Sequence, residues 1–222
     1  MIKALIFDFD GLILDTETPE VAVWRQIYAE HGFDYPVEKW SLTIGGWGEA
    51  AFDPGAELRR LAGPDLDLEA VRAKQRAQSG ALIQQEPILP GILDYLKEAR
   101  RLGLRLAIAS SSERAWVEPH LTRLGIRHHF EKIVCGDDVV PGHTKPFPDI
   151  FLKALSELGL PPEEAVVIED SPNGVRAAKA VGLFVVVVPN PTTAQLSPEP
   201  AKIHVRSLAE LPLKELLRRA QA

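Results

Sequence analysis

The sequence predicts an α/β fold in which an open parallel sheet, covered by helices on both faces, carries an inserted helical module. Two observations support this fold class. Short apolar runs alternate with helix-like segments through the second part of the chain. One further apolar run, residues 4–7, stands apart at the N-terminus, and only helical patterns separate it from that alternation. Strand–helix alternation at this spacing is typical of parallel sheets with helical crossovers.

The expected strands are short and mostly apolar, as is typical of buried parallel strands. They lie at residues 4–7, 104–109, 133–134, 165–168 and 184–188, with an edge strand at 203–205. The expected helices lie at 92–102, 113–124, 147–158 and 172–181, with a last helix at 208–219. Glycines follow the first four of these helices and mark their ends. The architecture is therefore Rossmann-like.

Residues 16–80 show helical patterns but not the strand–helix alternation of the later part of the chain. Val21, Trp24 and Ile27 recur at helical spacing, and residues 57–61 and 68–78 also predict helices, with no strong strand between them. Gly80 is expected to break the last of these helices. We therefore expect a core of residues 1–15 and 81–222, and a helical module of residues 16–80.

Composition excludes several classes of partner. The net charge is −6 and no dense Lys/Arg stretch occurs, which argues against nucleic acid. The N-terminal apolar run is cut by Asp8 and Asp10 too early for a signal peptide, and the later run 183–188 is far too short for a membrane span. The single cysteine, Cys135, fits a reducing compartment. We expect a cytoplasmic protein without a membrane partner, and a monomer, because its site is complete within one chain.

Polar side chains follow the predicted strands, at the sheet edge where open parallel sheets bind ligands. The segments are Asp8-Phe9-Asp10-Gly11, Ser110-Ser111-Ser112, Lys145-Pro146 and Glu169-Asp170. Each has a plain structural alternative. The aspartates could cap turns or a helix, the serines could cap the helix near Glu113, and Lys145 could be a solvated surface side chain.

The occurrence of all four polar segments in one chain favours a catalytic site over separate structural roles. Asp8, Asp10, Glu169 and Asp170 would place four carboxylates at one edge of the sheet. Two like charges about 4 Å apart repel by about 4 kcal/mol at an effective dielectric constant of about 20. A hard divalent ion with oxygen ligands, Mg²⁺ by preference, relieves this repulsion and also holds a phosphate. With Lys145 as a further positive charge, the set predicts a phosphoryl-transfer site.

In their order along the chain, these segments resemble the four motifs of the haloacid dehalogenase superfamily. Three longer segments match as well and resemble the β-phosphoglucomutase-like phosphatase branch: Gly11-Leu-Ile-Leu-Asp-Thr-Glu17, Lys145-Pro-Phe-Pro-Asp-Ile-Phe151 and Glu169-Asp-Ser-Pro-Asn-Gly-Val-Arg-Ala-Ala178. The resemblance implies that the module of residues 16–80 is a cap that closes over the site. Its hinges are expected near residues 15–19 and 79–86.

The resemblance implies a Mg²⁺-dependent phosphatase that hydrolyses a small phosphomonoester, such as a sugar phosphate, through an aspartyl-phosphate on Asp8. Asp10 is implied as general acid and then general base, a group that dehalogenases lack. Ser110 and Lys145 are implied as catalytic contacts of the phosphoryl group.

The resemblance also implies the residues around the metal and the substrate. Mg²⁺ ligands are expected from Asp8, Asp10, Glu169 and Asp170. Substrate contacts are expected from Gly11, Ser111, Ser112, Arg114, Gly46 and Trp47. Trp47 has a structural alternative, as a side chain packed in a tight turn of the cap.

A mutase must hold a second phosphate and therefore needs extra cations. The positions at which β-phosphoglucomutases use a His, an Arg and a Lys are matched here by Glu20, Glu49 and Glu113. The acidic residues favour a phosphatase. A β-phosphoglucomutase-type isomerase of a hexose phosphate stays open, because Arg114, Lys74 and Arg76 could substitute.

Two other classes are less favoured. A receiver-type phosphoacceptor domain is shorter and has no insertion after its first strand. A non-catalytic sugar-phosphate binder would not need Asp10.

Overall fold

The computed structural model describes residues 1–41, 43–44, 52–196 and 199–221. A six-stranded sheet with the strand order β3-β2-β1-β4-β5-β6 forms its centre, and every neighbouring pair is parallel. The strands are β1 (Ala4–Phe7), β2 (Arg105–Ala109), β3 (Lys132–Val134), β4 (Ala165–Glu169), β5 (Phe184–Val187) and β6 (Ile203–His204). The predicted open parallel sheet is confirmed.

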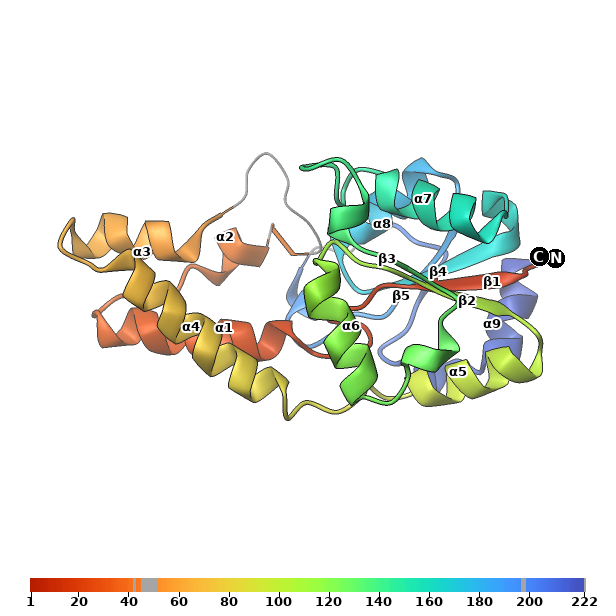
Figure 1. Ribbon diagram of the computed structural model, residues 1–222, viewed down its shortest axis with the longest axis horizontal. Coiled ribbons are helices and arrows are strands. Elements are labelled where there is room, and N and C mark those ends of the chain that lie inside the picture. Colours follow the sequence, from red (N-terminus) through yellow and green to blue (C-terminus); the bar gives the residue numbers. More distant parts are fainter. Residues whose placement is uncertain (42, 45–51, 197–198, 222) are drawn as a thin grey trace.

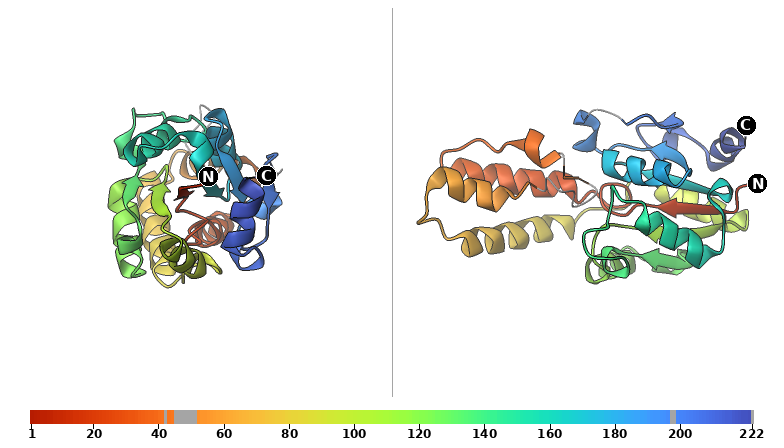
Figure 2. Two further views of the ribbon diagram at one scale, coloured as in Figure 1. Left: turned by 90° about the vertical axis from the view of Figure 1, so that its right-hand side faces the viewer. Right: turned by 90° about the horizontal axis from the view of Figure 1, so that it is seen from above.

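Helices cover both faces of this sheet (Figures 1 and 2). One face carries α5 (Ile92–Arg101), α6 (Arg114–Arg123) and α9 (Leu213–Ala220), and the other carries α7 (Asp149–Leu158) and α8 (Pro172–Ala180). In β1, Leu5 and Phe7 pack into the first core, whereas Ala4 and Ile6 pack into the second. Because the central strands are buried on both sides, their sequences are almost entirely apolar, and the polar residues lie at strand ends, such as Arg105 and Glu169.

A separate helical layer lies beyond the carboxyl ends of the strands (Figure 1). It consists of α1 (Glu17–Glu30), α2 (Val37–Ser41), α3 (Pro54–Ala62) and α4 (Leu68–Ile83). The layer has its own aromatic core, in which the Tyr28 ring meets the Tyr35 ring edge-on at 5.2 Å. Asp53 and Asp67 begin α3 and α4 by accepting hydrogen bonds from backbone amides of the first turn. We call this layer the cap; its boundaries at residues 16 and 80 stay a prediction.

The expected helix break at Gly80 was wrong. Helix α4 continues through Gly80 and ends at Ile83, which is buried in the core of the sheet domain. A glycine inside a helix costs about 1 kcal/mol relative to alanine, and burial of one isoleucine exceeds that cost.

The last helix also differs from its prediction. Residues Leu208–Glu210 form a short 3₁₀ turn, and α9 begins only at Leu213. Pro212 stands between them and cannot continue a helix, because it lacks the backbone N–H. The short helix α2 was not predicted.

Two chain crossings join the cap to the sheet domain, and they lie next to each other. Leu14 on the outgoing crossing pairs with Ile88 on the returning one, and the Leu89 N–H donates to the Ile13 carbonyl at 3.0 Å. The chain therefore enters and leaves the cap through two adjacent, hydrogen-bonded segments.

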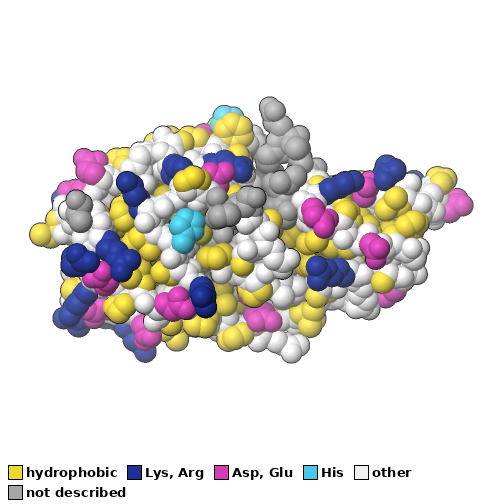
Figure 3. Space-filling model, turned by 180° about the vertical axis from the view of Figure 1, so that it is seen from behind, with side chains coloured by type: hydrophobic (Ala, Val, Ile, Leu, Met, Phe, Trp, Pro, Cys, Tyr) yellow, Lys and Arg dark blue, Asp and Glu magenta, His cyan; other side chains and the backbone are white. Residues whose placement is uncertain are grey.

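The surface is mixed in charge. Figure 3 shows basic and acidic side chains interspersed over the face it displays. None of the helices in the described residues has both the length and the apolar character that crossing a membrane requires.

Substitution of Leu96 tests how α5 packs against the core. Its side chain is fully buried, so Leu96→Ala should lower the free energy of unfolding by about 2–5 kcal/mol. Leu93 on the same helix is 41% exposed, and Leu93→Ala should cost less than about 0.5 kcal/mol. Urea unfolding of both variants measures the difference; equal losses would contradict this packing.

Candidate active site

Four separate segments converge at the carboxyl edge of the sheet. Asp8 follows β1, Ser110 follows β2, and Asp170 follows β4, and these three strands are neighbours in the order β2-β1-β4. Lys145 joins them from the segment before α7. All four side chains are buried. The strand order thus explains why residues distant in the sequence meet here.

Lys145 is the only cation in this buried group of the described residues. Its Nζ atom donates to Asp8 Oδ1 at 2.7 Å and to Glu169 Oε1 at 2.6 Å, and it lies 5.3 Å from the centre of the Phe151 ring. Burial by itself lowers the pKa of Lys145, but attraction by Asp8 and Glu169 outweighs it, so the pKa is raised. The alternative of a solvated surface lysine was wrong, because the side chain is 0% exposed.

Glu169 is held on both of its oxygens. Besides the contact of Oε1 with Lys145, Oε2 accepts hydrogen bonds from the Asp170 N–H at 2.9 Å and the Ser171 N–H at 3.0 Å. A Cβ atom at Gly174 would lie 1.7 Å from Glu169 Oε1, so the helix start requires glycine there. Glu169 therefore fixes both Lys145 and the loop that carries Asp170.

The alternative that Asp170 caps α8 and that a serine of residues 110–112 caps α6 was wrong. Ser171, rather than Asp170, caps α8 by accepting from the Gly174 N–H at 3.1 Å. The cap residue of α6 is Glu113 rather than a serine, and its side chain makes no capping hydrogen bond. The carboxylate of Asp170 and the serine hydroxyls are thus left for other contacts.

Asp8, Glu169 and Asp170 form a cluster suited to a cation. One carboxylate oxygen from each lies within 4.8 Å of the others. Burial and the Glu169 charge raise the pKa of Asp8 to about 7, against the opposing effect of Lys145. Burial, Glu17 and Glu169 raise the pKa of Asp170, whose buried Oδ1 atom has no hydrogen-bond partner in the described part of the chain.

These observations fit a hard divalent ion. Three buried carboxylates face one ammonium group, so a single lysine does not balance their charge. The available ligands are all oxygens, which Mg²⁺ prefers, and Asp170 Oδ1 is a buried acceptor that such an ion would satisfy.

Asn190 is a site residue that the sequence analysis missed. Its Nδ2 group donates to Asp170 Oδ2 at 2.8 Å, to Glu17 Oε2 at 2.7 Å and to the Gly11 carbonyl at 3.2 Å. It lies outside the four motifs, in the connection that follows β5. The rule that polar residues at strand ends form the site could have found it, because β5 is the neighbour of β4.

Gly11 is required by close packing. Its φ angle is +74°, and a Cβ atom there would lie 2.4 Å from Asp170 Oδ2 and 2.5 Å from Asn190 Nδ2. Its role as a substrate contact stays a prediction.

The Asp10 carboxylate points toward the segment after β2. Its Oδ2 atom accepts from Ser112 Oγ at 2.7 Å and from Ser110 Oγ at 3.3 Å, and its Oδ1 atom accepts from Trp116 Nε1 at 2.8 Å. Trp116 was also missed, since it lies on α6 and belongs to no motif. Asp10 and Ser110 are nevertheless brought together, as a shared phosphoryl site requires.

The remaining expected substrate contacts stay predictions. Arg114 is engaged by Asp138, by Glu118 at 3.5 Å and by the Ile133 carbonyl at 2.9 Å, contacts that do not favour substrate binding. Ser111 lies between Ser110 and Ser112 in the same loop. Gly46, Trp47 and Glu49 lie outside the described residues.

Glu20 lies in the first turn of α1, near enough to the site for the Asp10 charge to act on it. Burial and the Asp10 charge raise its pKa to about 7. A mutase would have a cation at this position.

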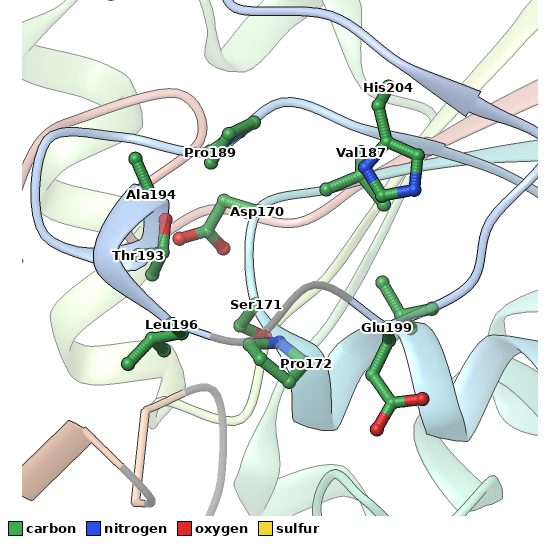
Figure 4. Close-up of a pocket in the computed structure, with 11 residues that line it drawn as sticks. Asp170, Ser171, Pro172, Val187, Pro189, Thr193, Ala194, Leu196, Glu199 and His204 are labelled. Atoms are coloured by element: carbon green, nitrogen blue, oxygen red, sulfur yellow. The ribbon is translucent and has the colours of Figure 1, made fainter.

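A cavity of about 100 Å³ adjoins Asp170 (Figure 4). Figure 4 shows the Asp170 carboxylate between the segment that carries Pro189 and Thr193 and the start of α8. Pockets for small organic ligands usually measure about 300–1,000 Å³. The cavity therefore borders the acidic cluster but is too small to hold a sugar phosphate.

Asn190→Ala should weaken Mg²⁺ binding about 10- to 100-fold, because Asp170 loses the group that orients it. The control is Gln195→Ala, in the same connection, whose exposed side chain donates to the Pro191 carbonyl at 2.9 Å. Calorimetric titration with MgCl₂ measures both affinities. An Asn190→Ala affinity equal to that of the control would exclude this role.

Known proteins resemble the chain along most of its length. The family model of the haloacid dehalogenase-like hydrolases matches residues 2–182. The protein YhcW of Bacillus subtilis (strain 168), whose name assigns it provisionally to the phosphatases, is 42% identical over 98% of this chain and 97% of its own length. The fructose-1-phosphate phosphatase YqaB of Escherichia coli (strain K12) is 36% identical over 83% of this chain and 95% of its own.

Solved structures indicate the same family as the sequence comparisons. The crystal structure of CbbY from Rhodobacter sphaeroides in complex with phosphate superposes with a TM-score of 0.71, at 32% identity over 95% of this chain and 96% of that one. β-Phosphoglucomutases are also among the structural neighbours, as the sequence resemblance predicted. The chain therefore belongs to the haloacid dehalogenase-like hydrolases, and within them it is a hydrolase of phosphoric monoesters.

Proposed function

We propose that the chain is a Mg²⁺-dependent phosphatase that hydrolyses a small phosphomonoester, a sugar phosphate or a similar metabolite, through an aspartyl-phosphate on Asp8. The observation that carries the proposal is the buried arrangement of Asp8, Lys145 and the acidic cluster at the carboxyl edge of β1. The phosphate complex of CbbY and the fructose-1-phosphate activity named for YqaB support this class of substrate.

In the first step, the Asp8 carboxylate attacks phosphorus in line with the ester oxygen. The bond from phosphorus to that oxygen breaks, and Asp10 donates a proton to the departing alcohol. Lys145, which donates a hydrogen bond to Asp8, keeps this nucleophile oriented and pairs with a phosphoryl oxygen. Ser110, which lies beside Asp10, donates its hydroxyl to another phosphoryl oxygen.

In the second step, water attacks the phosphorus of the aspartyl-phosphate while Asp10 accepts a proton from it. The bond from phosphorus to Asp8 breaks, which releases inorganic phosphate and restores the carboxylate. The same carboxyl group thus acts first as an acid and then as a base.

Mg²⁺ would be held by the Asp8 carboxylate, the Asp10 carbonyl and Asp170, with Glu169 in direct or water-mediated contact. When bound, the ion supplies positive charge that offsets the negative charge of the phosphoryl oxygens and of the clustered carboxylates.

Electrostatics favours a phosphatase over a mutase. Glu20 of the cap lies near enough to Asp10 for their charges to interact, where a second phosphate would need a cation. Of the cations that could substitute, Lys74 pairs with Glu30, and Arg114 pairs with Asp138 and Glu118, so these two are already engaged. A variant of the CbbY relative has been solved with xylulose-(1,5)-bisphosphate, so the family can hold two phosphates, and a mutase remains the second candidate.

The cytoplasmic location and the monomeric state remain proposals. The single cysteine supports the first. The monomeric state is supported by the site itself, because all of its described residues come from one chain.

Asp8→Asn should lower phosphate release by more than about a thousandfold, because the covalent nucleophile is lost. Asp94→Asn, an exposed position on α5, is the matched control and should keep full activity. Release of phosphate from a panel of sugar phosphates, with Mg²⁺ and with EDTA, measures both. Full turnover by Asp8→Asn would exclude the mechanism.

The phosphatase and the mutase differ in their products. With β-glucose 1-phosphate and a bisphosphate primer, the proposed phosphatase releases glucose and inorganic phosphate. Accumulation of glucose 6-phosphate instead would establish the second candidate.

A further inference from the structure

Trp116 makes the contact with Asp10 that no motif explains. Its Nε1 atom donates to Asp10 Oδ1 at 2.8 Å. The indole ring is fixed by its neighbours, because it meets the His120 ring edge-on at 4.5 Å and His120 in turn lies against Phe9 at 6.2 Å. The Trp116 N–H is therefore held as a donor to Asp10, the residue that serves as acid and base in the proposed function.

The two oxygens of Asp10 have different partners. The Trp116 indole only donates, so Asp10 Oδ1 is kept as an acceptor in either protonation state. Asp10 Oδ2 contacts the hydroxyls of Ser112 and Ser110, which both donate and accept. A proton is therefore compatible with the second oxygen and not with the first.

We propose that Trp116 is a positioning residue that holds Asp10 Oδ1, so that Oδ2 is the oxygen that gives a proton to the leaving alcohol and later takes one from water. This inference rests on the proposed function. Its new element is that helix α6 orients the Asp10 carboxyl group through the Trp116 N–H. Ser110 lies next to Oδ2, so the oxygen selected is the one on the side where the phosphoryl group is expected.

Trp116→Phe separates this role from packing, because it keeps an aromatic ring and removes the N–H. The readout is the dependence on the leaving group in the first turnover, with phenyl phosphate and 4-nitrophenyl phosphate as probes of similar shape. Phenolate is a much stronger base than nitrophenolate and depends more on protonation as it leaves. We expect Trp116→Phe to slow phenol release about tenfold and nitrophenol release less than about threefold, a difference within the range that one ordinary hydrogen bond provides.

Trp40→Phe is the control, because it removes the indole of a buried tryptophan in the cap. It should leave the ratio of the two rates unchanged. Equal slowing of both esters by Trp116→Phe, or no slowing of either, would overturn the proposal and leave Trp116 as a packing residue.

A second measurement does not depend on turnover or on the folding of Trp116→Phe. In ¹H–¹⁵N spectra of the full chain, the indole resonance of Trp116 should move upfield in Asp10→Ala, while that of Trp40 should stay in place. An unmoved Trp116 resonance would also overturn the proposal. Failure of the proposed function would appear separately, as undiminished turnover in Asp8→Asn.

Discussion

The site depends on one buried ammonium group. Lys145 is fully enclosed and touches Asp8 and Glu169, which come from adjacent strands. A buried lysine without partners would lose its proton, and buried carboxylates without a counter-charge would gain one. Lys145 keeps its charge because Asp8 and Glu169 raise its pKa, and in return it opposes the rise that burial and Glu169 cause in the pKa of Asp8. The remaining excess of negative charge, centred on Asp170, is what makes the edge of this sheet attractive to a divalent ion.

Much of this architecture could be predicted from the sequence, for a physical reason. Parallel strands buried on both faces are mostly apolar, so they stand out as runs such as Val166–Ile168, and the polar residues at their carboxyl ends mark the ligand edge. The convergence of Asp8, Ser110 and Asp170 follows from their positions just after parallel strands, whereas Lys145 reaches the same edge from the segment before α7. The motif resemblance added their expected roles.

What escaped prediction depends on contacts across the chain. Asn190 and Trp116 are ordinary residues in a loop and a helix, and only the folded arrangement brings them to Asp170 and Asp10. The helix through Gly80 was missed because local propensity was weighed without the burial of Ile83, a contact with the other domain. Local patterns thus located the strands well and the helix ends less well.

Asn190 gives the cap and the acidic cluster a common partner. One amide group touches Glu17, where α1 of the cap begins, and Asp170. A displacement of α1 that stretches the first contact alters the second. Thermodynamic coupling of this kind acts equally in both directions. If Mg²⁺ binds at Asp170 as proposed, its binding and a displacement of α1 would therefore not be independent, and each would bias the other by the same free energy.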